Sequence, residues 1–270
     1  GKQFNTVIYT GTGSSNAITG LGFQPDLVWI KRRNGTGDHK LTDSSRGVTK
    51  SLEVNDTGAE ATDTNGLTAF GSDGFTVGSD AAYNASSDTY VAWAWRANAS
   101  TTATNSSGAL NSTVQANTKA GFSIVEFPNY TSNSTFGHGL NSAPEFIIVK
   151  LTGGASSPVY HTGIGDSGKI LYFNNTNAAA SNATFNSTAP TNSVFSLGAP
   201  FGGSGAGVAW CWHSVEGFSR FSSYVGNGDA NGPFIYTGFR PRFLIIKAAD
   251  SGQTWFMYDT ARSTFNPVNR

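Results

Sequence analysis

One pattern occurs three times in this chain: a proline, then a run of large apolar residues that ends in a lysine. The copies are GFQPDLVWIK at 22–31, SAPEFIIVK at 142–150 and GFRPRFLIIK at 238–247. Proline cannot donate to a β-ladder, so it marks the first residue of a strand. Apolar residues that run together, rather than alternate, predict a strand covered on both faces. Each copy is therefore expected to be the central strand of a β-sandwich, with its lysine where the strand meets water.

Other segments repeat in the same register. A strand-like opener with Phe4, Phe122 or Phe218 precedes each proline, and YVAWAWRA at 90–97 corresponds to GVAWCWHS at 207–214. The third copy has no closing aromatic segment of this kind. Such spacing is typical of repeated structural units. The predicted organisation is a β-sandwich unit at 1–97, an Asn/Ser/Thr-rich linker at 98–120, a second unit at 121–216 and a partial third unit at 217–270.

The composition favours the same fold class. The 270 residues include 33 glycines, and aromatic and charged residues each make up 13%. Short β-branched and aromatic strands joined by Gly, Asn and Ser turns fit this mixture. The sequence predicts an all-β protein of tandem antiparallel β-sandwich units, jelly-roll or lectin-like, two complete and one partial.

Charge and hydropathy exclude several partners. The 17 basic residues balance 17 acidic ones, which argues against a nucleic-acid partner because phosphate binding needs a basic patch. No apolar run is long enough for membrane insertion, and the first residues lack the layout of a secretory signal. The one cysteine, Cys211, lies between Trp210 and Trp212 and is expected to be an inert buried thiol.

Candidate chemistry is sparse. The four histidines lack metal-ligand spacing, and no phosphate-binding or nucleophile motif is present. Asp43 with Arg46, and Asp259 with Arg262, are expected to be ion pairs that brace loops. The middle copy has Thr162 and Gly165 at these places.

The most acidic stretch contains Asp73, Asp80 and Asp88 with Asn84, a composition that calcium could use. The second copy lacks these acids, so we expect no metal, no cofactor and no catalytic residue. A glycosidase would need two carboxyl groups facing one cleft, and the sequence pairs none in that way.

The segment VAWAW places Val91, Trp93 and Trp95 on one strand face and Ala92 and Ala94 on the other. A tryptophan pair of this spacing could form a platform on which sugars stack. Its apolar neighbours favour packing in the core instead.

Several segments resemble a family. GFQPDLVWIK, TDSSRGVTK, SDGFTVGSD and YVAWAWRA, together with FNSTAPTNSVFSLG at 185–198, the stretch 213–247 and ARSTFNPVNR at 261–270, are similar to an uncharacterised tandem-repeat domain family of marine tailed-bacteriophage virion structural proteins. The resemblance covers nearly the whole chain except 98–117. It implies a protein of the virus particle surface, such as a tail fibre, spike or capsid fibre, and no assigned enzyme activity.

The resemblance and the composition together predict a non-enzymatic virion structural protein, extracellular on the particle, that attaches to a host surface glycan. Its other partners would be further virion subunits, with a homo-oligomer, a trimer by analogy. A purely architectural subunit that assembles through its incomplete third unit is the alternative, and a polysaccharide-degrading fibre enzyme is a third. Tyr83, Tyr130 and Tyr160 should lie in solvent in an adhesin and between subunits in a lattice protein.

Overall fold

The computed structural model describes residues 3–201 and 205–263, so the two ends of the predicted organisation lie outside it. Within this part the protein is all-β, as predicted, and every pair of named strands is antiparallel. The first unit is a sandwich of a six-stranded and a three-stranded sheet. The larger sheet has the order β1 (Phe4–Thr10), β9 (Thr89–Trp95), β3 (Leu27–Arg32), β4 (Lys40–Asp43), β5 (Lys50–Glu53), β6 (Ala61–Thr62). The smaller has the order β2 (Asn16–Thr19), β8 (Gly74–Val77), β7 (Leu67–Gly71), and the one-turn helix α1 (Ala81–Asn84) follows β8.

The second unit repeats this plan with a larger main sheet. Its eight strands have the order β10 (Ala103–Asn105), β11 (Ser112–Asn117), β12 (Phe122–Phe127), β19 (Gly207–Trp212), β14 (Phe146–Leu151), β15 (Pro158–His161), β16 (Lys169–Tyr172), β17 (Ala180–Ser181). A two-stranded sheet of β13 (Ser134–Gly137) and β18 (Val194–Leu197) covers one face. Two short 3₁₀ turns, η1 (Thr162–Ile164) and η2 (Ala183–Phe185), complete the unit.

The region 98–120 differs from the predicted linker, because β10 and β11 lie within it. β11 pairs with β12 from Thr113 to Asn117 and thereby extends the second sheet beyond the opener strand. The sequence signal is weak here because a strand can be held by backbone hydrogen bonds with few apolar side chains. Val114, which is 5% exposed, is the main anchor of β11 in the core of the second unit.

In the part of the third unit that the structure describes, β20 (Phe243–Ile246) and β21 (Phe256–Asp259) pair with each other and with no other described strand. The opener strand predicted around Phe218 does not form; the described residues there make only an isolated bridge between Val215 and Ser219. In the first unit the opener β1 pairs with the closing strand β9 alone. No described residue of the third unit supplies such a closing strand, so its opener has no ladder to join.

The repeated apolar bursts form β3, β14 and β20. β3 and β14 lie inside their sheets, between the closing strand and the next strand along the chain, as predicted. The prediction for their lysines is wrong for Lys150, which is fully buried. Its Nζ donates to the carbonyl oxygens of Asp56 and Ala155, at 2.6 Å each. A loop of the first unit therefore covers the end of the second unit's central strand.

The closing strands are buried on both faces. Val91, Trp93 and Trp95 pack between the units, whereas Ala92 and Ala94 face the core of the first unit, as the alternation predicted. β19 repeats the arrangement, with its aromatic face between the units and the small residues Ala209 and Cys211 in the core of the second unit. Burial also raises the pKa of the Cys211 thiol, which therefore remains protonated.

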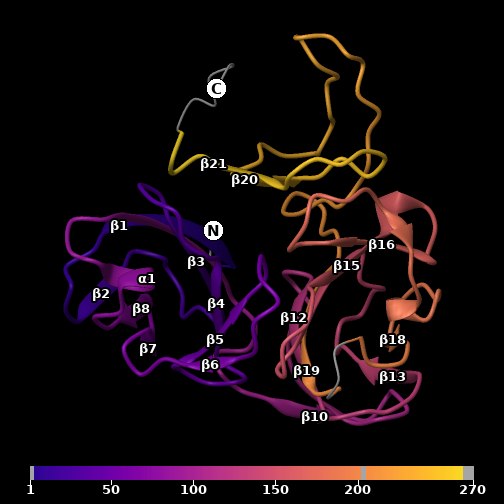
Figure 1. Cartoon of the computed structure of the whole chain (residues 1–270), viewed down its shortest axis with the longest axis horizontal. Helices are drawn as coiled ribbons and strands as arrows, with labels where there is room; N and C mark the ends of the chain where they lie inside the picture. Colours follow the sequence, from indigo (N-terminus) through magenta and orange to yellow (C-terminus); the bar gives the residue numbers. More distant parts are fainter. Residues whose placement is uncertain (1–2, 202–204, 264–270) are drawn as a thin grey trace.

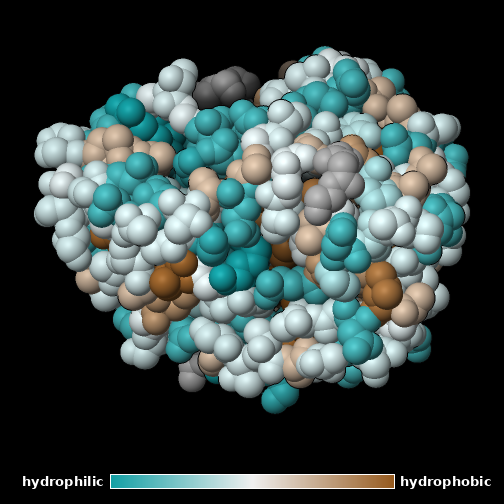
Figure 2. Space-filling model, turned by 60° about the horizontal axis from the view of Figure 1, so that its bottom comes forward, coloured by the Kyte–Doolittle hydropathy of each residue, from teal (hydrophilic) through white to brown (hydrophobic). Residues whose placement is uncertain are grey.

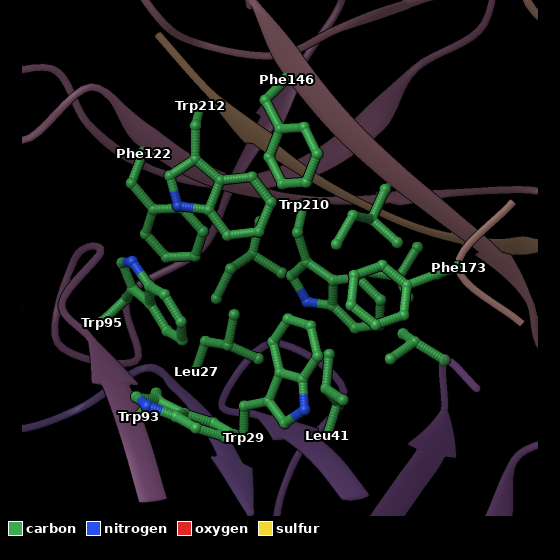
Figure 3. Close-up of a cluster of buried hydrophobic side chains, with 14 of the residues drawn as sticks. Leu27, Trp29, Leu41, Trp93, Trp95, Phe122, Phe146, Phe173, Trp210 and Trp212 are labelled. Atoms are coloured by element: carbon green, nitrogen blue, oxygen red, sulfur yellow. The ribbon is translucent and has the colours of Figure 1, made fainter. Parts of the chain in front are cut away.

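The three parts meet at one aromatic centre, which we call the shared core. Figure 1 shows the first unit, the second unit and β20–β21 arranged around the middle of the molecule. Figure 3 shows tryptophans of β3 and β9 pointing toward those of β19 and toward Phe146. Phe243, Ile245, Trp255 and Met257 of the third part pack against the shared core. The large side chains that both complete units contribute to it are Leu27, Trp29, Leu41, Trp93, Trp95, Phe122, Phe146, Phe173, Trp210 and Trp212.

Two hydrogen bonds repeat around this centre. Trp210 of the second unit donates from Nε1 to Asp43 of the first, at 3.2 Å. Trp93 of the first unit donates in the same way to Asp259 of the third, at 3.1 Å. Each acceptor is fixed by the arginine three residues later, Arg46 or Arg262, which also lies over the same tryptophan ring. Both predicted Asp–Arg pairs are thus confirmed, and each also joins two units.

The corresponding residue of the second unit is His161, not the Thr162 that equal spacing indicated. His161 pairs with Phe146 as Asp43 pairs with Leu27 and Asp259 with Phe243. The connection before β15 is one residue shorter than that before β4, which shifts the alignment. His161 faces Phe221 instead of a tryptophan, with ring centroids 6.5 Å apart.

The exterior is mainly polar. On the face shown in Figure 2, hydrophobic residues form small separate patches in a hydrophilic or neutral surface. Among the described residues, no helix has the length and apolar character needed to cross a membrane.

Candidate functional site

The acidic residues weighed as a calcium site lie apart and have other partners. Asp73 accepts from the backbone nitrogens of Gly20 and Gly22, at 3.1 and 2.5 Å. Both glycines have positive φ, so this carboxylate closes a turn that contains two glycines. Asp80 caps α1, and Asp88 pairs with Arg32 at 2.6 Å.

Asn84, the fourth residue of that group, is fully buried. Its side chain holds the 12–14 loop through the backbone of Thr12 and Ser14. The four side chains thus have separate partners and do not together form one cation site.

A different acidic cluster, which the sequence did not indicate, is formed by Asp38, Glu53 and Asp56. One oxygen from each lies within 4.8 Å of the others. This donor set has the hard oxygen character that suits a divalent cation. Lys40 already forms a salt bridge with Glu53, and Asn55 donates to Asp38 at 2.8 Å. These contacts therefore explain the cluster as a network of ion pairs and hydrogen bonds.

The exposure of three tyrosines was expected to distinguish an adhesin from a lattice protein, but it does not. Tyr83, Tyr130 and Tyr160 are 1%, 4% and 7% exposed and belong to the cores of their own units. They lie neither in solvent nor on a surface available to another subunit.

The feature that brings all three parts together at the surface is a cavity of about 380 Å³ beside the shared core. We call it the central cavity. The first unit lines it from β3, the β3–β4 loop and the residues after β5, the second from the loop after β16, and the third from β21 and its flanks. The lining residues are Lys31, His39, Asn55, Trp93, Phe173, Asn174, Asn175, Thr176, Thr254, Trp255, Met257 and Arg262.

The aromatic wall of the central cavity is rigid. Trp255 stacks on Phe173 with ring centroids 4.6 Å apart and ring planes 14° from parallel. The indole Nε1 of Trp255 donates to the carbonyl oxygen of Tyr172 at 2.9 Å. Trp255 is only partly buried, whereas Phe173 behind it is 5% exposed. The ring of Trp255 is thus fixed in orientation while part of its surface remains available.

His39 has a defined protonation state. Its Nδ1 accepts a hydrogen bond of 2.8 Å from Nε1 of Trp29, so the ring proton resides on Nε2. Burial, together with the nearby positive charge of Lys31, lowers the pKa of His39 to about 4. At neutral pH the ring is therefore an uncharged donor, held beside Trp93 at a centroid distance of 6.5 Å.

Two cations complete the central cavity. Arg262 is held by Asp259, at 2.5 Å, and by the carbonyl oxygen of Met257, at 2.7 Å. These bonds use Nε and Nη2 and leave Nη1 without a partner among the described residues. Lys31 donates to the carbonyl oxygen of Arg32 at 3.0 Å, and burial lowers its pKa from the ordinary value.

Amide side chains also line the cavity. Asn174 accepts from the backbone nitrogen of Ser157 at 2.9 Å, and Asn175 accepts from that of Asn177 at 3.0 Å. Asn174 is thereby oriented by the residues before β15, and Asn175 by its own loop. No Asp or Glu is among the described residues that line the cavity. The arrangement suits binding of a hydroxyl-rich or anionic ligand and provides no pair of carboxyl groups for general acid–base hydrolysis.

Sequence reasoning did not find this site. It treated His39 as an isolated histidine and Lys31 as a strand end, and it gave no role to Asn174, Asn175 or Trp255. The residues come from three units that are far apart in the chain, so no local motif unites them. The only available signal was the equivalence of the bursts, since Lys31 ends the first of them.

Comparison with known proteins gives a family. A family model described as "Domain of unknown function (DUF7483)" matches residues 1–270. No curated protein and no solved structure matches the chain.

Proposed function

The chain belongs to the DUF7483 family, and we propose that it is a non-enzymatic structural protein of a bacteriophage particle that attaches the particle to a host surface glycan. It would be a component of a tail fibre, spike or capsid fibre, exposed on the virion and extracellular. The motif resemblance described above supports the place on the particle. The central cavity supports the attachment.

The observation that carries the proposal is the composition of the central cavity. It combines a partly exposed indole with oriented amide side chains, and its described lining has no carboxyl group. Aromatic faces stack on the C–H faces of sugars, and amide groups bind hydroxyls, so this combination is a binding site for carbohydrate. A hydrolase would need an acid and a base or nucleophile beside the same bond.

The test is binding of the purified chain to polysaccharide extracted from host cell surfaces. We expect saturable binding, with no release of reducing ends. Trp255→Ala should weaken it by about tenfold, in line with the loss of one stacking side chain. Tyr236→Ala is the matched control because Tyr236 is 72% exposed and does not line the cavity. Equal binding by both variants would remove the central cavity from the proposal.

A second candidate function is favoured by a separate observation: the described part of the third unit has strand edges without a partner and apolar side chains in solvent. Among the described strands β20 pairs with β21 alone, and the loop before it exposes Val225 and Phe234 at 88% and 89%. An unpaired strand edge and exposed apolar residues both promote association. The chain would then be an architectural subunit, and a trimer is the state that analogy with fibres suggests.

The native mass of the full chain tests this second function. An assembly through the third unit should be an oligomer that becomes monomeric in the double variant Val225→Asp, Phe234→Asp. Val48→Asp, at a 39% exposed position of the first unit, should leave the mass unchanged. A wild-type monomer at all concentrations would dismiss assembly through this surface.

A further inference from the structure

The charges of the central cavity are one-sided. Lys31 and Arg262 line it, and the carboxylate nearest to Arg262, that of Asp259, is only 6% exposed and already binds both Arg262 and Trp93. Asp38 is the other acid close enough to affect Lys31 and His39, but it is exposed, outside the lining, and takes a hydrogen bond from Asn55. Arg262 is therefore already ion-paired, and Lys31 is the cation of the lining that a ligand meets without a salt-bridge partner among the described residues.

The free polar groups of the cavity are mainly donors. The Nδ1 atom of His39 is occupied by Trp29, so Nε2–H is the group left to donate. Arg262 retains Nη1, and the ammonium of Lys31 uses only one of its three protons on Arg32. Donors held in place before a ligand arrives bind an anion without the cost of reorganisation.

The partly exposed ring of Trp255 lies in the same cavity as these donors. An inorganic anion would make no use of an indole face. A neutral sugar would stack on it but would leave Lys31 without a counter-charge and Nη1 of Arg262 without an acceptor. The volume of about 380 Å³ is at the lower end of ligand pockets and suits one or two sugar rings.

From this combination we infer that the central cavity binds an anionic sugar, with the acidic group on Lys31, His39 and Arg262 and the ring on Trp255. This inference rests on the proposed attachment to a glycan and names the class of sugar recognised. The glycan would carry uronic acids or other carboxylated sugars.

The experiment is calorimetric titration of the full chain with three probes: methyl glucuronide, methyl glucoside and inorganic sulfate. We expect the glucuronide to bind about tenfold more tightly than the glucoside, the difference typical of one added charge-assisted contact. Its affinity should fall as salt rises, because screening weakens the contact with a cavity that opens to solvent.

Matched variants connect the preference to the cavity. Lys31→Met keeps the aliphatic stem and removes the charge, so glucuronide affinity should fall about fivefold or more while glucoside affinity stays the same. Lys169→Met removes an exposed lysine of β16 outside the cavity and should leave both affinities unchanged. Lys31→Arg should restore most of the preference, because the charge returns.

The outcomes separate the two proposals. If both sugars bind equally, or if Lys31→Met does not alter their ratio, the anionic preference is overturned while glycan attachment stands. If sulfate binds in a Lys31-dependent way and neither sugar binds, the cavity is an anion site and the sugar inference is overturned. If none of the probes binds and host polysaccharide also fails to bind, both proposals are rejected.

Discussion

The indole nitrogen of Trp210 lies 3.2 Å from a carboxylate oxygen of Asp43, and neither residue has any exposed surface. The two residues belong to different units, and Arg46 binds the same carboxylate at 2.8 Å. One buried acid therefore satisfies a donor from each side of the contact between the units. Buried polar groups that are fully paired in this way define a unique packing.

Asp43→Ala should destabilise the protein by about 3–5 kcal/mol, because it leaves a buried indole N–H without its acceptor and takes one of two carboxylates from the buried guanidinium of Arg46. Chemical denaturation followed by tryptophan fluorescence measures the change. Asp88→Ala, which breaks the more exposed pair with Arg32, is the control and should cost about 1 kcal/mol or less. Similar losses for both would mean that the contact between the units contributes little.

Lys150→Met should destabilise the protein by about 1–3 kcal/mol, since the carbonyl groups of Asp56 and Ala155 lose their donor. Lys31→Met is the matched control, because Lys31 occupies the equivalent strand position and donates only to the adjacent residue. Thermal unfolding at neutral pH makes the comparison. A smaller loss for Lys150→Met than for Lys31→Met would show that the lysine does not tie the units together.

The buried position of Lys150 also predicts that the free energy of unfolding depends on pH in the alkaline range. Burial lowers its pKa in the folded protein to about 8, so between that pH and about 10.5 the unfolded chain binds the extra proton. Stability attributable to this residue should then rise as pH rises through the interval. The measurement is the free energy of unfolding from pH 7.5 to 10, and Lys150→Met should lack this component. A wild type and variant that change in parallel would contradict the lowered pKa.

Glu126 on β12 should have the opposite effect on the acid side. Burial, with Asp43 and Glu60 nearby, raises its pKa to about 7, so the folded state binds the proton more strongly between about 4.5 and 7. Its contribution to stability therefore falls as pH rises through that range. Glu126→Gln should be more stable than the wild type at pH 8, by about 1 kcal/mol after allowance for solvent screening. Equal denaturation midpoints at pH 8 would mean that the carboxyl group is well solvated.

His138 should make the protein sensitive to acid. The ring is fully buried, accepts from the backbone nitrogen of Leu140 and hydrogen-bonds the carbonyl oxygen of Thr191, each at 3.1 Å. Burial lowers its pKa to about 4, so the unfolded chain binds a proton first as pH falls from 6.5, and stability is lost down to pH 4.

His138→Asn keeps an acceptor for Leu140 and cannot be protonated. It should lose stability at pH 7 but show a flatter acid profile than the wild type, which circular dichroism during acid titration would detect. His39, with a pKa also near 4, should retain its own part of the slope in both proteins.

Local patterns predicted the strands well. The apolar bursts, the large–small alternation of VAWAW and the two Asp–Arg pairs each depend on residues a few positions apart, and the structure shows all of them. The strand β11 was missed because its stability comes from backbone pairing with β12. His161 was missed because a shorter connection shifted the alignment by one residue.

The burial of Lys150 and the central cavity depend on how the units dock. The sequence of the loop at 55–58 contains no pattern that predicts its contact with β14, a strand almost a hundred residues later. The lining of the cavity likewise extends from Lys31 to Arg262. Such long-range juxtaposition comes from the fit of whole surfaces, which a single sequence does not express in local periodicity.

The pairing of β1 with β9 has a consequence for the order of events during translation. Phe4 lies opposite Trp95, so β1 leaves the ribosome almost a hundred residues before the strand it pairs with. In the second unit β12 can pair with β11 at once, but its other edge is free until β19 has been made. Each unit should thus stay open, with its nascent edge available to chaperones, and then close in a single late step.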